Sequence, residues 1–238
     1  MSESATHRLL PEHSVPEDLQ AHLAAFGPRP VIDPAAMVGA LDESGLRGRG
    51  GAEFPAGVKW RAVRESPHDS AERVVVANAA ECEPASRKDR TLLSLRPHLV
   101  LDGLEHAAET VGARRAVIYT TRSHSEVQAT LAAAIAERRR HSDSSLFIEL
   151  LIGPNRYVSG EETAVVSRVS GHLAKPKVVP PRPFQHGVNG LPTLVQNVET
   201  LAQAALIGSG LVAVNPNYRH SVAIAAKKVL DLLLALCH

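Results

Sequence analysis

The stretch RVVVANAA, residues 73–80, is a short apolar run rich in valine that leads into the polar segment ECEPASRKDR. Short runs of β-branched residues with polar flanks are typical of strands that are buried on both faces. Two more runs of this kind follow, RRAVIYTT at 114–121 and SSLFIELLIG at 144–153. The sequence therefore predicts three buried strands.

Helical patterns separate the predicted strands. Residues 89–95 and 98–111 lie between the first and second runs, and an Ala-rich segment at 125–140 lies between the second and third. Strands that alternate with helices of this length indicate an α/β fold with a largely parallel sheet. Further helices are expected at 16–27, at 34–43, from Pro55 onward and at 197–208.

Ligands of open parallel sheets collect beyond the carboxyl ends of the strands. The acidic segment that follows the first strand lies at such an end and supplies Asn78, Glu81 and Glu83. Side chains of these types can accept hydrogen bonds from ribityl or ribose hydroxyls. A solvated acidic turn remains the alternative interpretation.

A glycine-rich segment, GLRGRGGAEFPAGVKW at 45–60, precedes the first strand. Glycines let the backbone approach a ligand, and free N–H groups beside a helix N-terminus form an anion site. Neither common phosphate motif fits, because the dinucleotide pattern would place Glu53 at its last glycine and because the loop contains no Gly-Lys pair. A phosphate cradle and a tight structural turn therefore both remain open.

Composition excludes several classes of protein. The formal charge is +1, so no broad basic surface for nucleic acid is expected. Cys82 and Cys237 are far apart and the 12 histidines have no ligand spacing, so we expect no disulfide framework and no metal site. The sequence shows no secretory signal and no apolar run near the ~20 residues of a membrane span. We expect a cytoplasmic protein.

Five segments in a fixed order resemble one known family: GLRGRGGAEFPAGVKW, NAAECEPASRKDR, YVSGEETA, KPKVVPPRP and GLPTLVQNVETLA. Together they closely resemble the NADH-binding FMN flavoprotein subunit of respiratory complex I, the 51-kDa-type subunit. The same module occurs in related NAD-linked hydrogenases and formate dehydrogenases. The resemblance covers about residues 33–207. It implies a Rossmann-like α/β module that binds FMN and receives a hydride from NADH.

The resemblance also implies a set of binding residues. The residues that would bind FMN are Gly48, Arg49, Gly50, Gly51, Ala52, Lys59, Asn78, Glu81, Gly160, Glu161, Glu162, Asn197 and Thr200. Those that would contact NADH are Phe54, Glu83, Glu162 and Arg182. No side-chain nucleophile or general base is implied, because the flavin performs the redox chemistry.

Several positions depart from the family pattern: Glu53 for a glycine, Ala80 for an aspartate, Gln196 for an asparagine, and Cys82 and Ala85 for other small residues. The family clamps the NADH adenine with three aromatic rings, of which this sequence retains only Phe54. Ala62 and Arg182 occupy the other two positions. Each lost ring removes about 1–3 kcal/mol of stacking, so NADH binding is more affected than FMN binding.

Two functions therefore remain open. The first is an NADH dehydrogenase-like flavoprotein module that transfers a hydride from NADH to FMN and passes electrons to a partner in trans. The second is a degenerate, non-enzymatic module for flavin binding or protein association. Whether the chain is an enzyme stays open at this point.

The expected organisation has three parts. Residues 1–32 form a polar segment with a short helix, residues 33–208 form the FMN/NADH-binding α/β domain, and residues 209–238 form a helical tail. The family's ubiquitin-like and iron–sulfur domains are expected to be absent, so this chain would carry no iron–sulfur cluster. We expect a redox protein partner with such a cluster, and a location in the cytoplasm or at the periphery of a membrane complex.

Overall fold

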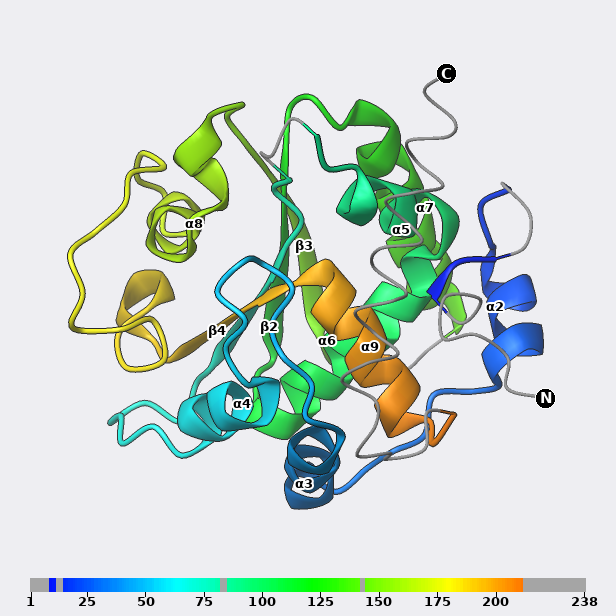
Figure 1. The fold of residues 1–238 in the computed structure, drawn as a ribbon, viewed down its shortest axis with the longest axis horizontal. Coiled ribbons are helices and arrows are strands. Elements are labelled where there is room, and N and C mark those ends of the chain that lie inside the picture. The colour runs from blue at the N-terminus through cyan, green and yellow to red at the C-terminus, as the bar shows by residue number, and fades with distance from the viewer. Residues whose placement is uncertain (1–8, 12–14, 82–84, 142–143, 212–238) are drawn as a thin grey trace.

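The computed structural model describes residues 9–11, 15–81, 85–141 and 144–211. It has a mixed α/β fold around a four-stranded, all-parallel sheet with the order β3-β2-β1-β4 (Figure 1). The strands are β1 Val74–Asn78, β2 Arg115–Thr121, β3 Phe147–Gly153 and β4 Thr193–Asn197. The predicted α/β class and largely parallel sheet are therefore confirmed.

The helices expected before the C-terminal tail all form, with bounds that differ from the expectation by a few residues. They are α2 Leu19–Phe26, α3 Pro34–Ser44, α4 Ala56–Arg64, α5 Lys88–Leu95, α6 Pro97–Val111, α7 Ser125–His141 and α9 Val198–Gly208. The structure adds α8 Glu162–Val169 and the short 3-10 turns η1 Tyr157–Gly160 and η2 Val188–Gly190. Most of the predicted C-terminal tail, residues 212–238, lies outside the described residues.

β1 contributes side chains to two separate hydrophobic cores, one on each face of the sheet. Val75 and Ala77 pack among the helices α3, α4, α6 and α9, while Val74 and Val76 pack with α8 and η2 on the opposite face. Figure 1 shows α8 on one side of the sheet and α6 and α9 on the other. Because successive side chains of a strand point to opposite faces, a strand covered on both faces is apolar throughout. This packing explains the valine run.

The order of the strands creates a switch point. The chain runs from β1 to β2 and β3 on one side, and then returns to place β4 on the other side of β1. In register, Asn78 at the end of β1 lies beside Asn197 at the end of β4. A crevice forms at the carboxyl ends of the strands where the order reverses, and open α/β sheets bind ligands there.

Part of the N-terminal segment packs against the α/β layers. On α2, the buried His22 lies 2.8 Å from the carboxylate of Asp102 on α6 (Nε2 to Oδ2). Arg29 forms an ion pair with Glu105 of α6, at 2.9 Å. The division of the chain at residue 33 stays a prediction. Across the part of the chain that the structure describes, no helix is long and apolar enough to cross a membrane.

The central helix α6 approaches α9 very closely. A Cβ atom built at Gly103 of α6 would overlap the backbone carbonyl of Leu201 on α9. A backbone carbonyl cannot move aside as a flexible side chain can, so the two helices would have to separate. Gly103 therefore sets the distance between these helices.

We expect Gly103→Ala to lower the free energy of unfolding by at least about 2 kcal/mol, because added volume in a packed core forces backbone shifts. Gly39→Ala is the matched control, since Gly39 is also helical and has nothing within 4 Å of its built Cβ. It should raise stability by about 0.5–1 kcal/mol, as alanine does at open helix positions. Urea denaturation monitored by circular dichroism measures both. Equal stability of the two variants would contradict this assignment.

Candidate functional site

A cavity of about 310 Å³ lies at the switch point, beyond the carboxyl ends of β1 and β4. The glycine loop, the end of each of these strands, and the start of α8 all contribute to its walls. The lining residues are Gly48, Gly50, Ala52, Glu53, Phe54, Lys59, Asn78, Gly160, Glu161, Glu162, Val195, Gln196 and Asn197. The structure thus brings together residues that are far apart in the sequence.

Many of the expected cofactor residues are among them. Gly48, Gly50, Ala52, Lys59, Asn78, Gly160, Glu161, Glu162 and Asn197 line the cavity, with Phe54 and Glu162 from the NADH set. Others do not appear in its lining, namely Arg49, Gly51, Glu81, Thr200 and Arg182. Glu83 lies outside the described residues. The sequence did not identify Val195, and it indicated Glu53 and Gln196 only as departures from the family pattern.

The glycine loop is closed by backbone hydrogen bonds between its two arms. The N–H of Gly48 donates to the carbonyl of Phe54 at 2.8 Å, and the N–H of Ala56 donates to the carbonyl of Leu46 at 2.8 Å. A Cβ at Gly48 or Gly50 would meet its nearest atom at 3.5 or 3.6 Å, which is ordinary van der Waals contact. Close packing therefore does not demand glycine at these two positions, and their missing side chains leave room inside the cavity.

Two side chains of α9 anchor this loop from outside the cavity. The backbone N–H of Arg49 donates to the hydroxyl of Thr200 on α9 at 2.9 Å, and Thr200 is fully buried. The Arg49 guanidinium lies 3.8 Å from the carboxylate of Glu199 (Nε to Oε1). Arg49 and Thr200 thus position the loop against α9.

Hydrogen bonds to the buried side chain of Glu81 fix the start of the acidic loop against α5. The Glu81 carboxylate accepts from the backbone N–H groups of Asp89 and Arg90 at 3.2 and 3.3 Å, and from the Ser86 hydroxyl. Its side chain is 3% exposed and lies at the N-terminus of α5, where a negative charge suits the helix dipole. Its expected contact with the flavin stays a prediction.

Asn78 connects the sheet to the far wall of the cavity. Its side-chain amide donates to the carbonyl of Gly160 at 2.8 Å and accepts from the N–H of Ala80 at 3.2 Å. A Cβ at Gly160 would come within 2.7 Å of the Ala80 carbonyl oxygen, so this close approach requires glycine. The end of β1 and the start of α8 are therefore fixed to each other.

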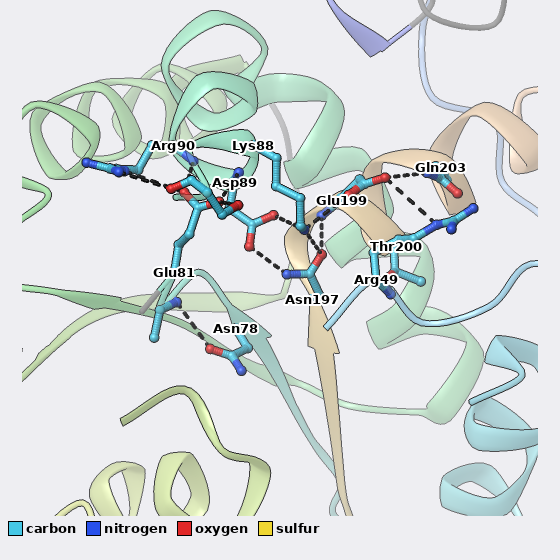
Figure 2. Close-up of polar contacts among 12 residues, drawn as sticks. Arg49, Asn78, Glu81, Lys88, Asp89, Arg90, Asn197, Glu199, Thr200 and Gln203 are labelled. Atoms are coloured by element: carbon cyan, nitrogen blue, oxygen red, sulfur yellow. Dashed lines mark hydrogen bonds and ion pairs between the residues drawn. The ribbon is translucent and has the colours of Figure 1, made fainter. Parts of the chain in front are cut away.

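Figure 2 shows a network of charged and polar groups around Asn197, which is one of the residues that line the cavity. Lys88 contacts Asp89 at 2.7 Å, Glu199 at 3.0 Å and the Asn197 carbonyl oxygen Oδ1 at 3.2 Å. The amide of Asn197 donates to Asp89 at 2.7 Å. This network joins the acidic loop to the start of α9 and occupies the side chain of Asn197, which also caps α9 through the N–H of Glu199.

The pKa of Asp89, one of the acids in this network, is strongly shifted. Burial raises its pKa to about 6 from the ordinary value of 3.8, and the neighbouring charge of Glu81 adds to this, while Lys88 and Asn197 oppose the shift. The folded chain thus binds a proton at Asp89 more tightly than the unfolded chain does.

The stability that this proton confers is fully present below about pH 3.8 and is lost as the pH rises to about 6. We therefore expect the stability of Asp89→Asn relative to the unsubstituted chain to increase over this window and then to level off. Asp69→Asn, in the loop before β1, is the control. Urea unfolding at several pH values measures the difference. A difference for Asp89→Asn that stays constant from pH 4 to pH 7 would contradict the assignment.

Glu53 has an unfavourable backbone conformation. It lies at the mouth of the cavity with a φ of 48°, which is in the left-handed region that favours glycine. Its carbonyl accepts from the Arg47 guanidinium at 3.1 Å. The loop therefore keeps its conformation at the expense of backbone strain at Glu53.

We expect Glu53→Gly to be about 1 kcal/mol more stable than Glu53→Ala, because only glycine relieves the strain of the left-handed conformation. Both variants remove the same carboxylate, so their difference isolates the backbone. Thermal unfolding of the two proteins provides the measurement. If Glu53→Ala were as stable as Glu53→Gly, the backbone would not be strained.

The other residues that the resemblance implies for NADH do not all lie at the cavity. Phe54 is 51% exposed at the cavity, whereas Arg182 is exposed and lies outside the lining. The backbone N–H of Arg182 donates to the Gln185 side chain at 3.1 Å. Ala62 presents only a methyl group on α4. Of the three positions at which the resemblance implies an adenine clamp, only Phe54 therefore carries an aromatic ring.

Gln196 is the one lining side chain with an unused buried acceptor among the residues that the structure describes. It is 4% exposed, and its carbonyl oxygen Oε1 has no hydrogen-bond partner. A buried polar atom without a partner costs free energy, and a ligand can supply the missing partner. This atom indicates a ligand with a hydrogen-bond donor.

Several known proteins are similar to this chain in sequence and in fold. A family model described as the Nuo51 FMN-binding domain matches residues 41–206. The F subunit of the NADH-quinone oxidoreductase of Aquifex aeolicus is 35% identical over 185 residues, which are 74% of this chain and 43% of the relative. The corresponding protein of Escherichia coli is 35% identical over 194 residues, 76% of this chain and 42% of the relative.

A hydrogenase subunit and a solved hydrogenase structure are also similar. The NAD-reducing hydrogenase HoxS subunit alpha of Cupriavidus necator is 33% identical over 187 residues, 74% of this chain and 31% of the relative. A chain of the NAD⁺-reducing [NiFe]-hydrogenase in the H₂-reduced state matches with a TM-score of 0.70 and 37% identity, covering 75% of this chain and 32% of that chain. The chain spans about two fifths of the length of the two NADH-quinone oxidoreductase relatives. The chain thus belongs to the family of the FMN-binding domain of the 51-kDa subunit of complex I.

Proposed function

We propose that this chain is an FMN-binding, NADH dehydrogenase-like flavoprotein module. The observation that carries the proposal is the cavity at the β1–β4 switch point, which is bordered by the glycine loop, Lys59 and Asn197, the N-cap residue of α9. Family membership supports the same ligand, because the family is defined by FMN binding. Open α/β sheets bind nucleotides at this place.

The residues present fit FMN. A volume of about 310 Å³ lies at the lower end of the range for small-molecule sites, about 300–1,000 Å³. The unpaired Gln196 carbonyl can accept from a hydroxyl of the ribityl chain. The N-terminus of α9, which begins after Asn197, presents positive charge to an anion and can bind the phosphate, while Lys59 lines the same cavity.

The flavin, when bound, supplies the chemistry of accepting a hydride from NADH. The protein contributes binding and orientation. Gly48 and Gly50 leave the space that side chains would fill, and Asn78 fixes the wall that faces them. The exposed ring of Phe54 offers a stacking surface for a base at the mouth of the cavity.

Electron transfer out of the module is proposed to use a partner. The relatives are named as subunits of NADH-quinone oxidoreductases and of an NAD-reducing hydrogenase. By analogy, a redox protein with an iron–sulfur cluster would receive electrons from this chain. We place the α/β domain at residues 33–208, and the protein in the cytoplasm or at the periphery of a membrane complex.

A non-enzymatic flavin-binding module is the second candidate, and one observation favours it. Two of the three aromatic positions of the adenine clamp hold Ala62 and Arg182, and Arg182 does not line the cavity. Losing two stacking contacts of about 1–3 kcal/mol each, about 2–6 kcal/mol together, weakens NADH binding by roughly 30-fold to more than ten-thousandfold. Such a chain would bind flavin without reacting at ordinary NADH concentrations.

An anaerobic titration of the FMN-loaded protein with NADH separates the two functions. We expect one FMN per chain and loss of the absorbance of the oxidised flavin as NADH is added. Flavin that binds but stays oxidised would favour the non-enzymatic module, and Ala62→Phe with Arg182→Phe should then restore the reaction. Protein that retains no flavin after desalting would contradict FMN binding itself.

A further inference from the structure

The segment 163–198, which runs from α8 to the start of α9, contains no acidic residue. Its basic side chains are Arg168, His172, Lys175, Lys177, Arg182 and His186. The whole chain is nearly balanced, with 26 Lys and Arg against 25 Asp and Glu, so this segment is a local concentration of positive charge. Figure 1 shows its middle part, in yellow, as a loop that leaves α8 and runs out from the sheet.

A second cavity, which we call the basic pocket, lies between α8, this loop and η2. Its volume is about 380 Å³, which is within the range of small-molecule sites, about 300–1,000 Å³. The polar residues that line it are Thr163, Ser170, His172, Lys177, His186 and Asn189. No carboxylate is among its described lining residues, whereas Glu53, Glu161 and Glu162 line the cavity at the switch point.

Hydrogen bonds hold the walls of the basic pocket together. The backbone N–H of Lys177 donates to the Thr163 hydroxyl at 2.7 Å and joins the loop to α8. The backbone N–H of Asn189 donates to the Ser170 hydroxyl at 3.1 Å and joins η2 to the end of α8. The pocket is therefore formed in the chain without a ligand.

The hydrogen-bond donors of the basic pocket are not used by the protein. The Lys177 ammonium group and the imidazole rings of His172 and His186 make no hydrogen bond or ion pair with the described residues. At the switch-point cavity, by contrast, Lys59 is paired with Glu162 at 2.7 Å. An ammonium group has three N–H donors, and each imidazole has at least one. The basic pocket thus presents several donors that no carboxylate of its lining occupies.

The basic pocket is distinct from the proposed flavin site, although the first turn of α8 contributes to both. Glu161 and Glu162 line the switch-point cavity and Thr163 lines the basic pocket, but no residue lines both. The Thr163 hydroxyl donates to the Glu161 carboxylate at 2.6 Å, so the two linings are in direct contact. A ligand in the basic pocket would therefore be a neighbour of the flavin.

We infer that the basic pocket is a second anion site, which binds the phosphate group of a small ligand. Lys177 supplies positive charge, and His172 and His186 supply N–H donors. A phosphate group has three free oxygens for three separate side chains, whereas a carboxylate has two. Clefts lined by one sign of charge also concentrate ions of the opposite sign.

Two sources share this chemistry. One is a free phosphorylated ligand, and the other is the additional phosphate of NADPH, which NADH lacks. Only the second source rests on the proposed function, because it requires a dinucleotide bound beside the flavin. The binding of a phosphate to the pocket does not.

Inorganic pyrophosphate is the probe, and calorimetric titration of the flavin-free chain at about 0.15 M salt gives its dissociation constant. We expect saturable binding that Lys177→Met weakens about three- to tenfold, because a charge-assisted hydrogen bond is lost. Lys175→Met is the matched control, since Lys175 is an exposed lysine of the same loop that does not line the pocket. It should change the affinity by less than about twofold. Lys177→Arg keeps the charge and should retain most of the affinity.

A histidine pair gives an independent comparison. His186→Leu should also weaken pyrophosphate binding, whereas His141→Leu, which changes an exposed histidine at the end of α7, should not. Equal effects of Lys177→Met and Lys175→Met would mean that only the general charge of the loop matters, and would overturn the inference. The absence of saturable pyrophosphate binding to the unsubstituted chain would overturn it as well.

Competition with NADPH and NADH identifies the source of the phosphate. If it belongs to a dinucleotide, NADPH displaces pyrophosphate at lower concentrations than NADH does, and Lys177→Met removes this difference. Equal displacement by the two dinucleotides, or none, assigns the pocket to a free phosphorylated ligand. If the chain retains no flavin, the proposed function fails, while the pyrophosphate titrations still decide the inference.

Discussion

The pairing of β1 with β4 is the constraint on which the rest of the site depends. It sets Asn78 beside Asn197, and each of these residues connects to a different part of the cavity wall. Asn78 reaches the turn before α8 through Gly160, while Asn197 caps α9. The glycine loop is then fixed to α9 through the Arg49 N–H and Thr200. A shift of this pairing would separate all of these walls.

Buried polar groups stabilise the loops at this edge of the sheet. Glu81 and Asp89 are almost fully buried, and each is satisfied by several hydrogen bonds or ion pairs. Removing one member of such a network costs much more than the network contributes, because the others lose their partners. Several acidic residues near the cavity thus position helices, while glycines, Lys59 and Gln196 supply the binding surface.

The sequence predicted the regular part of the fold well and the site only in part. Three strands and the helices followed from apolar runs and periodicity. β4 was missed because TLVQN is short, follows a proline-rich segment and leads directly into the α9 cap at Asn197. Family motifs identified most of the cavity lining. They could not reveal that Glu81 and Thr200 lie outside this lining, because the direction of a side chain depends on packing.

Tertiary contacts between distant segments could not be predicted from the sequence either. Lys59 and Glu162 belong to motifs that are far apart in the chain, and only the arrangement of α4 and α8 makes them neighbours. Likewise, the burial of Gln196 without a partner for its carbonyl depends on how β4 inserts beside β1. The positive φ of Glu53 follows from the closure of the glycine loop.

A crystal structure of the chain with bound FMN tests the central claim most directly. It should show the flavin at the carboxyl ends of β1 and β4, with the phosphate near the start of α9 and a ribityl hydroxyl within hydrogen-bond distance of Gln196. Flavin bound elsewhere on the protein, with this cavity unchanged, would contradict the assignment of the site.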